Sequence, residues 1–328
     1  MKEAGGIAIS MIMGALTAAL MACSHHAGNH THSASEPQYH IRPRADSVSS
    51  NYYYTVRSES HSEYTVNDKK LELGSTTELG MRFDLAKDSG GGILVHITYD
   101  KLHIVMDNRG EHKDVTARQG DNSADPVERM LGNVLGSVLT VQLDKKGVVR
   151  QVSGDKEISA NVFGALSGAD PSVKLVVETQ LGKLFGADFA KNTLQQIFKM
   201  VPDSITHVGD SWSMDHVPEG VKMQITHTYT LSAVDGSVAS VDGSSKIESD
   251  GDNSITFMDQ QLPATITGEE ESHYKIDVHS GMLTQGHSEL SMKGQLSVMG
   301  KNVPIVFHSE KSIEGKKETL SAPSPSSL

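Results

Sequence analysis

Apolar and polar residues alternate along most of this chain with a period of two. The pattern is clearest in the C-terminal half, where apolar residues share one parity over residues 223–233 and again over 274–278. Such alternation predicts strands with one buried face. Asp235-Gly236 lies between two of these runs and is a strong hairpin signal. The chain is therefore expected to be mainly β.

One run changes its parity part-way. Apolar residues occupy odd positions from Ile93 to Tyr99 and even positions from Leu102 to Met106. An extra residue inserted into one strand of a pair produces this shift. We expect a β-bulge or a tight turn near Asp100-Lys101.

Two segments have helical spacing instead. Asp125 is a good cap, Pro126 suits the first helical position, and apolar residues recur every three or four positions after it. These features predict a helix over residues 126–137. A second helical region is predicted over 156–200, interrupted near Gly186.

The expected fold is α+β: a curved antiparallel sheet or incomplete barrel with these helices packed on its apolar face. Gly286 and Gly294 lie on the apolar parity of one long strand, where glycine permits bending. Each half of the globular region, 51–155 and 205–316, contains a hairpin. A duplication joined by the helical segment is one interpretation of this similarity.

The N-terminus predicts export. Residues 5–22 are apolar and uncharged, but they are fewer and smaller than a bilayer span requires. Leu20-Met21-Ala22-Cys23 resembles the lipobox of bacterial lipoproteins. The resemblance implies a signal peptide over 1–22 and lipid attached to Cys23. The alternative is an ordinary thiol in an N-terminal anchor helix. Against it, Cys23 is the only cysteine, so no disulfide explains it and an unpaired exported thiol would be reactive.

The regions on either side of the globular domain, 51–316, lack apolar periodicity. Residues 23–50 are expected to be a flexible tether, and 317–328 a disordered tail. Histidines in the tether are candidate ligands for zinc or copper, although a solvated linker is the preferred interpretation. They are His25, His26, His30 and His32. No acidic cluster follows Cys23, so we expect the protein to be attached to the outer membrane of a bacterial envelope and to face the periplasm.

Composition excludes some functions. The formal net charge is -12, which argues against nucleic acid as a partner. Aromatic residues make up 5% of the chain, so no stacking surface is evident. We expect no cofactor and no bound metal.

A turn with the sequence Gly209-Asp210-Ser211-Trp212 follows the helical region, and a strand containing Thr226-His227-Thr228-Tyr229 comes after it. These motifs resemble a family of uncharacterised exported lipoproteins from Bacteroidota. The resemblance extends from about Asn51 to Lys311. It implies an envelope location and a β-rich fold, and it implies no chemistry.

A hydrolase centre is the alternative interpretation of the same turn. Nearby acid, base and hydroxyl groups are present, namely His207, Asp210, Ser211, Asp215 and His216. However, the turn follows a helix and precedes a strand, and no Gly-x-Ser-x-Gly elbow occurs at Gly286-His287-Ser288. We therefore expect no catalytic residue here, and a structural turn with Trp212 in the core.

Three other groups of polar residues are candidates for a site. His227 lies in an otherwise apolar row. It could be a ligand or catalytic group, but a core histidine with one hydrogen-bond partner is the preferred interpretation. The acidic turn over 248–253 lacks the full pattern of a calcium loop. A surface metal site at His273, His279, His287 and Glu289 is less expected than a solvated face.

No stretch specifies a molecular function. The first hypothesis is a non-enzymatic binding protein for an apolar ligand or an envelope component, attached to the membrane by its lipid. The second is a structural subunit of an envelope complex, and the third is a hydrolase. A cavity, an exposed apolar patch or a cleft with converging His and Asp would distinguish them.

Overall fold

The computed structural model describes residues 24–27, 37–44, 50–66, 69–108, 111–120, 123, 125–164, 194, 197–198, 200–202, 204–205, 207–216, 223–249, 254–257, 260–298 and 300–318. Almost all of them belong to strands. Fourteen strands and two helices are found in this part of the chain. The N-terminal strands are β1 (Ser24–Ala27), β2 (Ser50–Val66), β3 (Lys69–Lys87), β4 (Ile93–Asn108), β5 (Glu111–Thr116), β6 (Val138–Leu143) and β7 (Val149–Ser153). The C-terminal strands are β8 (Ser211–His216), β9 (Met223–Asp235), β10 (Val238–Ser249), β11 (Ser254–Phe257), β12 (Gln260–Asp277), β13 (Leu283–Val298) and β14 (Lys301–Glu318).

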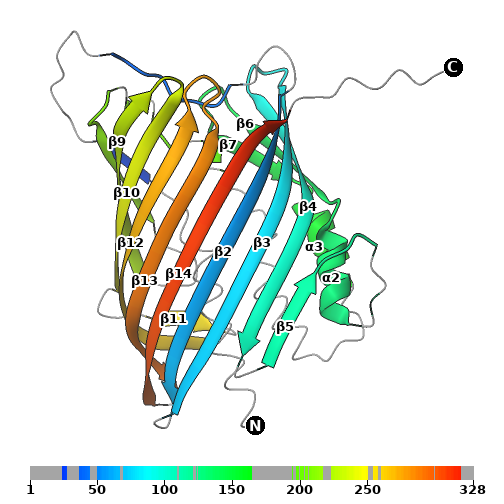
Figure 1. Ribbon diagram of the computed structural model, residues 1–328, viewed down its shortest axis with the longest axis vertical. Coiled ribbons are helices and arrows are strands. Elements are labelled where there is room, and N and C mark those ends of the chain that lie inside the picture. The colour runs from blue at the N-terminus through cyan, green and yellow to red at the C-terminus, as the bar shows by residue number, and fades with distance from the viewer. Residues whose placement is uncertain are drawn as a thin grey trace.

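The strands form one antiparallel sheet that curls around an apolar interior (Figure 1). Its order is β1-β8-β9-β10-β12-β13-β14-β2-β3-β4-β6-β7, with β5 beside β4 and β11 beside β12. Two meanders therefore meet at the centre, where the last strand, β14, pairs with β2. Among the described strands, β1 and β7 end the path, and the sheet does not close. The predicted fold class, a curved antiparallel sheet with few helices, is confirmed.

The predicted bulge is present in β4. Gly80 of β3 pairs with Lys101 and Met81 pairs with Tyr99, so Asp100 has no partner in the register. Tyr99 and Leu102 can therefore both lie in the core, where they are 2% and 3% exposed. The bulge accounts for the change of parity in the sequence.

Two helices lie beside β4 in Figure 1, and their buried side chains belong to the same apolar cluster as buried residues of β4 and β6. They are α2 (Pro126–Val134) and α3 (Asp155–Gly164). The first is shorter than predicted, because the chain turns at Gly136, whose φ of 78° is unfavourable for most other residues. Most of the predicted helical region beyond Gly164 lies outside the described residues. No described helix is long and apolar enough to cross a membrane.

The interior contains two separate apolar clusters. The larger, which we call the upper cluster, includes residues of α2 and α3 and the upper ends of the strands in Figure 1. The smaller, the lower cluster, consists only of strand residues among those described. Its members are Tyr64, Leu73, Ile225, Ile247, Ala264, Ile266, Leu290, Met292, Leu296, Val303, Ile305 and Phe307.

Part of the predicted tether packs against the sheet. Ile41 is 5% exposed and belongs to the upper cluster. The Arg44 amide donates a hydrogen bond of 2.9 Å to the Ser280 carbonyl in the β12–β13 turn. Pro43 lies against Gly147 in the β6–β7 turn. Residues 41–44 thus contact hairpins from both meanders, whereas the polar composition of 23–50 predicted a flexible segment. The apolar side chains of Ile41 and Pro43 explain why this part of the segment packs against the hairpins.

Candidate functional site

Polar residues interrupt the inner face of the sheet between the two apolar clusters. The strand register aligns them in two neighbouring rows, which we call the polar band. Its upper row consists of Ser272, Ser288, Lys311, Ser58 and Thr77. Its lower row consists of His227, Ser245, Glu270, Ser309, Ser60 and Ser75, with Leu290 between Glu270 and Ser309.

The rows on either side of the band are mainly apolar. Directly above it lie Leu231, Val241, Tyr274, Gly286, Ile313, Val56, Leu79 and Leu102. Directly below it lie Ile225, Ile247, Gly268, Met292, Phe307, Ser62 and Leu73. A strand face packed on an apolar core normally continues its apolar pattern. The band is therefore a local departure, two residues deep, that extends across six adjacent strands from β10 to β3 and reaches β9 at His227.

A hydrogen-bonded chain crosses the buried end of the band. His227 Nδ1 is hydrogen-bonded to Ser245 Oγ, which also lies 3.1 Å from Glu270 Oε2. The distance from His227 Nδ1 to Glu270 Oε2 is 3.6 Å. The side chains of His227 and Glu270 are 2% and 15% exposed. An acid and a base thus share one hydroxyl in the interior of the sheet.

Burial changes the proton affinity of the two charged members. It raises the pKa of the Glu270 carboxyl above its usual range, and hydrogen bonds from Ser245 and Ser288 and the charge of Lys311 offset part of the rise. It lowers the pKa of Lys311 to about 8, although the charge of Glu270 opposes this change. The charge on each residue therefore stabilises the ionised form of the other, whereas burial disfavours the ionised forms of both.

The opposite end of the band is more accessible. On β2 and β3 the inner-facing residues Ser58, Ser60, Ser75 and Thr77 are only partly buried. Ser60 Oγ and Ser75 Oγ are 2.7 Å apart and form a hydrogen bond between the strands. Val56 and Leu79, in the row above, are also partly buried. Hydroxyl groups and apolar side chains are thus accessible side by side on the inner face.

Aromatic rings border the buried part of the band. Tyr229 stacks on Trp212 at 5.6 Å between ring centroids and on His227 at 6.0 Å. Its ring also covers Gly243, its partner on β10, where an added Cβ would lie 2.6 Å from the ring. Glycine is therefore the residue that leaves room for the tyrosine beside the band.

The Gly209-Asp210-Ser211-Trp212 turn connects to β8 and holds the end of β9. The Gly209 amide donates to the Leu231 carbonyl at 2.8 Å, and the Leu231 amide donates to the Asp210 carbonyl at 2.9 Å. The Asp210 carboxylate accepts a 2.9 Å hydrogen bond from the His207 amide. Trp212 is 1% exposed. These contacts fit a structural role, which remains a prediction.

The hydroxyl of this turn is hydrogen-bonded to the neighbouring strand β9. Ser211 Oγ lies 2.8 Å from Thr230 Oγ1, with which it forms a hydrogen bond. The His207 ring faces Asp210 instead, at 3.8 Å from Nδ1 to Oδ2. The side chains of Asp215 and His216 lie outside the described residues.

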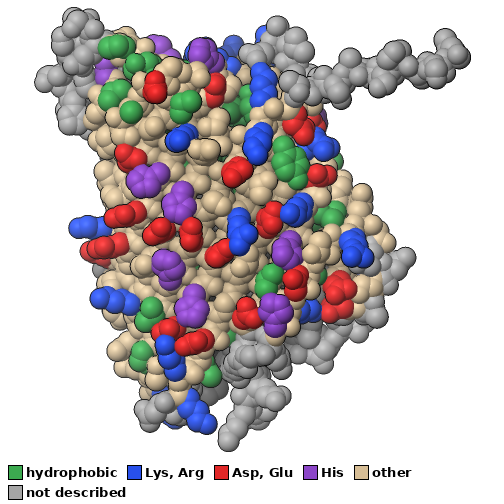
Figure 2. Space-filling model, viewed as in Figure 1, with side chains coloured by type: hydrophobic (Ala, Val, Ile, Leu, Met, Phe, Trp, Pro, Cys, Tyr) green, Lys and Arg blue, Asp and Glu red, His purple; other side chains and the backbone are tan. Residues whose placement is uncertain are grey.

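The outer face of the sheet carries histidines and carboxylates in close mixture (Figure 2). His287 Nε2 lies 3.2 Å from Glu289 Oε1, and His273 Nδ1 lies 2.8 Å from Asp242 Oδ1. Within the described part of the chain, no three His, Cys, Asp or Glu side chains are arranged to hold a metal ion. Cys23, His30 and His32 lie outside it, as do the side chains of His25 and His26 and most of the acidic turn over 248–253.

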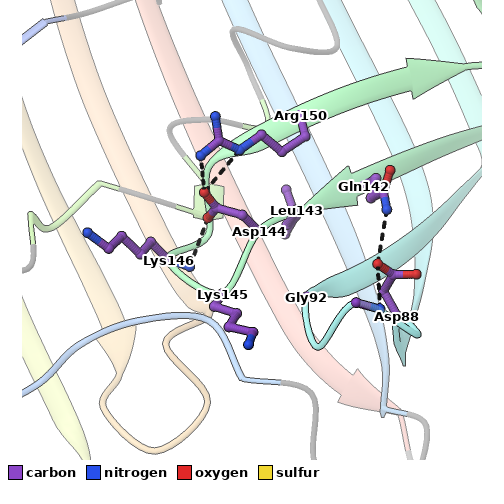
Figure 3. A pocket seen from close by; sticks show the side chains of 9 residues that line it. Asp88, Gly92, Gln142, Leu143, Asp144, Lys145, Lys146 and Arg150 are labelled. Atoms are coloured by element: carbon purple, nitrogen blue, oxygen red, sulfur yellow. Dashed lines mark hydrogen bonds and ion pairs between the residues drawn. The ribbon is translucent and has the colours of Figure 1, made fainter.

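An open pocket of about 620 Å³ lies where the β3–β4 turn meets the β6–β7 hairpin (Figure 3). Its carboxylates are used by the turns themselves. Asp144 accepts hydrogen bonds from the amides of Lys146 and Val148, at 2.8 and 3.0 Å, and from Arg150. These bonds outweigh the effect of burial and lower the pKa of Asp144. Gln142 donates a 3.0 Å hydrogen bond to Asp88 and lowers the pKa of that carboxyl. The pocket thus lies between two tight turns whose carboxylates, Asp88 and Asp144, are already hydrogen-bonded.

Sequence reasoning singled out His227 but missed Glu270 and Lys311. A signal for both was present, since each lies on the apolar parity of its strand. Glu270 follows Ala264, Ile266 and Gly268 at steps of two, and Lys311 follows Val303, Ile305, Phe307 and Ser309. Glu270 was missed because it lies within the run Glu269-Glu270-Glu271, which has the composition of a solvent-exposed segment.

A protein-family model matches residues 91–283, more than half of the chain; it describes a family of unknown function, DUF6263. The chain belongs to this family. The DUF6263 match includes the Gly209–Trp212 turn and the strands from β4 to β12. A domain of unknown function was expected from the sequence. No curated protein matches the chain.

Several solved structures have a distant likeness to the DUF6263 chain. Lipovitellin, in a structure titled for its lipid–protein interactions, matches over 87% of this chain with 10% identity and a TM-score of 0.43. This chain spans about a quarter of lipovitellin, 26%. OpdQ of Pseudomonas aeruginosa has 8% identity and a TM-score of 0.20, over 82% of this chain and 98% of its own. A DUF1329 family protein from Desulfovibrio piger has 10% identity and a TM-score of 0.14, over 82% and 87%. At these TM-scores the likenesses carry no argument about function.

Proposed function

We propose that this protein binds an amphipathic, mainly apolar molecule on the inner face of its sheet, with the polar group of that molecule at the polar band. One observation carries the proposal: hydroxyl and charged groups cross the inner face between two apolar clusters, and their β2–β3 end is partly accessible. Ligand sites typically combine a mainly apolar lining with a few fixed polar groups.

The energetics favour a ligand role for the band. Polar groups inside an apolar core cost free energy unless they are paired, and apolar residues of similar volume would stabilise the core at least as well. Eight polar or charged residues are buried among those described, and five of them belong to the band: His227, Ser245, Ser272, Ser288 and Ser309. This concentration is expected of a surface that receives a polar group.

The alternative, a structural subunit of an envelope complex, is less well supported. Such a subunit requires a large exposed apolar patch. The large exposed apolar residues in the described part of the chain are Val138 of β6, Val306 of β14 and Val208 of the turn before β8, so they lie in three different parts of the chain. Single exposed residues of this kind are common on any protein surface.

We further propose that the protein is exported and anchored by lipid on Cys23, facing the periplasm from the outer membrane. The support is the lipobox-like sequence before the only cysteine. Changing Cys23→Ala should abolish incorporation of labelled palmitate, and unchanged labelling would contradict the anchor. Protease added to intact cells should leave the protein intact if it faces the periplasm.

Native mass spectrometry and organic extraction of the purified full chain test the binding proposal. We expect a co-purifying or saturably bound amphiphile. Ser60→Leu, which fills the accessible end of the band, should reduce this binding, whereas Glu59→Gln on the outer face of the same strand should not. If no amphiphile is found and an apolar dye shows no saturable site, the proposal fails.

A further inference from the structure

Residues 39–44, which we call the strap, contact one hairpin turn from each meander of the sheet. Pro43 lies against Gly147 in the β6–β7 turn, where an added Cβ would be 3.2 Å from the proline ring. The Arg44 amide donates its 2.9 Å hydrogen bond to the Ser280 carbonyl in the β12–β13 turn. In the strand order, β14, β2, β3 and β4 separate these two hairpins. The strap is therefore a direct link between parts of the sheet that are not neighbours.

Both turns have a glycine where the strap contacts them. Gly147 and Gly281 have φ values of 78° and 69°, a conformation that favours glycine. A Cβ added at Gly281 would overlap the carbonyl group of Arg42. By contrast, Gly236 in the β9–β10 turn also has a positive φ, of 57°, but an added Cβ there meets no atom within 4 Å. Gly147 and Gly281 thus form the turns and also leave room for the strap.

The strap is attached by few contacts. Within the described part of the chain, the bond from Arg44 to Ser280 is the one backbone hydrogen bond that joins the strap to other residues. Ile41 and Pro43 are buried and Tyr39 is partly buried, whereas the other strap residues are exposed. Segments with few buried apolar contacts and few backbone hydrogen bonds open at a lower free energy than the whole domain unfolds. The strap has both of these properties.

The side chains of the strap pack on the upper cluster. Ile41 belongs to this cluster and Tyr39 packs against it, together with Leu143 and Met282 from the ends of the two hairpins. Leu143 and Met282 are 1% and 0% exposed. Removal of the strap would therefore expose apolar side chains at the upper end of the sheet, where the described strands do not close into a barrel.

We infer that the strap is a releasable cover. When it is docked, it holds the two meanders together and covers part of the upper cluster. When it is released, the sheet stays folded and apolar molecules gain a route to that cluster. The inference goes beyond the proposed function, because it does not depend on what binds at the polar band.

Thiol labelling of the folded full chain tests the release. Ile41→Cys places a thiol on the strap, and Met292→Cys places one in the lower cluster, where Met292 is 3% exposed. Each variant reacts with a thiol reagent without denaturant, and peptide mapping counts the reaction at Cys23 separately. We expect labelling of Ile41→Cys to be at least about tenfold faster, because local opening requires less free energy than unfolding. Equal rates would overturn the inference, since the strap would then leave only when the domain unfolds.

Two changes with matched controls test what holds the strap. Gly281→Ala should speed the labelling of Ile41→Cys about tenfold, because the new Cβ displaces the strap. Gly236→Ala introduces similar backbone strain away from the strap and should not. Arg44→Pro removes the amide donor and should also speed labelling, whereas Arg44→Ala keeps the donor and should not. Equal effects within the pairs would overturn the inference, and the Arg44 pair decides if Gly281→Ala does not fold.

An apolar fluorescent dye measures the exposure of the upper cluster in the same variants. We expect Gly281→Ala and Arg44→Pro to bind more dye than their controls, with unchanged circular dichroism from the sheet. Faster labelling with no added dye binding would contradict the exposure of the cluster. Faster labelling that is accompanied by loss of the sheet signal would show unfolding in place of release, and would also overturn the inference.

Discussion

The ring of Tyr274 lies on Gly286, its direct partner across β12 and β13. A Cβ added at Gly286 would be 3.0 Å from the tyrosine ring and 3.5 Å from the Ile313 side chain. The Tyr229 ring covers Gly243 in the same way. Large aromatic side chains thus fit beside the polar band because glycines face them, and the glycine in the long strand has a packing reason as well as a role in curvature.

This contact predicts that Gly286→Val destabilises the fold. The ring must move to make room, and overpacking of this kind costs about 1–3 kcal/mol. Chemical denaturation measures the change in the free energy of unfolding. Gly164→Ala is the control, since a Cβ there meets no atom within 4 Å. Equal stability of the Gly286→Val variant and the unmodified protein would show that the ring is not held in place.

Trp212 and Ser211 should respond differently to truncation. Trp212→Ala removes a fully buried side chain that stacks on Tyr229, and we expect a cost of about 3–5 kcal/mol. Ser211→Ala removes one half-buried hydroxyl pair and should cost about 1 kcal/mol or less. A hydrolytic activity that is lost specifically in Ser211→Ala would contradict the structural role of this turn.

Lys311 should make the free energy of unfolding depend on pH in the alkaline range. Burial lowers the pKa of Lys311 to about 8 in the folded chain from 10.5. Between these values the unfolded chain binds more protons at this residue, so the contribution of Lys311 to stability rises as the pH increases. We expect the unmodified protein to gain about 1–3 kcal/mol relative to Lys311→Met between pH 7.5 and 10.

The matched control for this experiment is Lys293→Met, on the exposed face of β13. Comparison with a variant cancels the effects of other lysines and of tyrosines that titrate in the same range. A difference between the unmodified protein and Lys311→Met that does not change with pH would contradict the effect of burial on this lysine.

Four glutamates on the outer face should repel one another. Glu271, Glu289, Glu310 and Glu59 lie directly opposite one another on four adjacent strands. Like charges in this relation destabilise a sheet, so Glu310→Gln should add about 0.2–1 kcal/mol at pH 8, and high salt should reduce the gain. Glu314→Gln is the control on the same strand. Its register partners, Gln285 and Thr55, are uncharged, and its exposed ion pair with Lys316 adds little stability. A gain that is equal in both variants would contradict the repulsion.

Local features of the fold could be predicted from the sequence. Alternation identified most strands and their buried faces, and the parity change between Tyr99 and Leu102 located the bulge at Asp100. The cap at Asp125 located the start of α2. These features depend on a few neighbouring residues and on the geometry of one strand or helix.

Features that depend on distant pairing could not be predicted. The pairing of β14 with β2 joins residues about 250 positions apart, as in the hydrogen bond from Ser309 Oγ to the Glu59 carbonyl. The polar band exists only in this register, because Lys311 and Ser58 become neighbours through it. The packing of Ile41 on the core likewise depends on hairpins that are far away in the sequence.

Photo-crosslinking is the most direct test of the central claim that the inner face binds an amphiphile. A lipid with a diazirine near its head group is bound to the full chain and activated, and the modified residues are mapped by peptide sequencing. Successive residues of β2 face opposite sides of the sheet. Modification at Val56, Ser58 and Ser60, with little at Arg57 and Glu59, is the predicted result. Modification confined to Arg57 and Glu59, or none that excess unlabelled lipid can compete away, would contradict the claim.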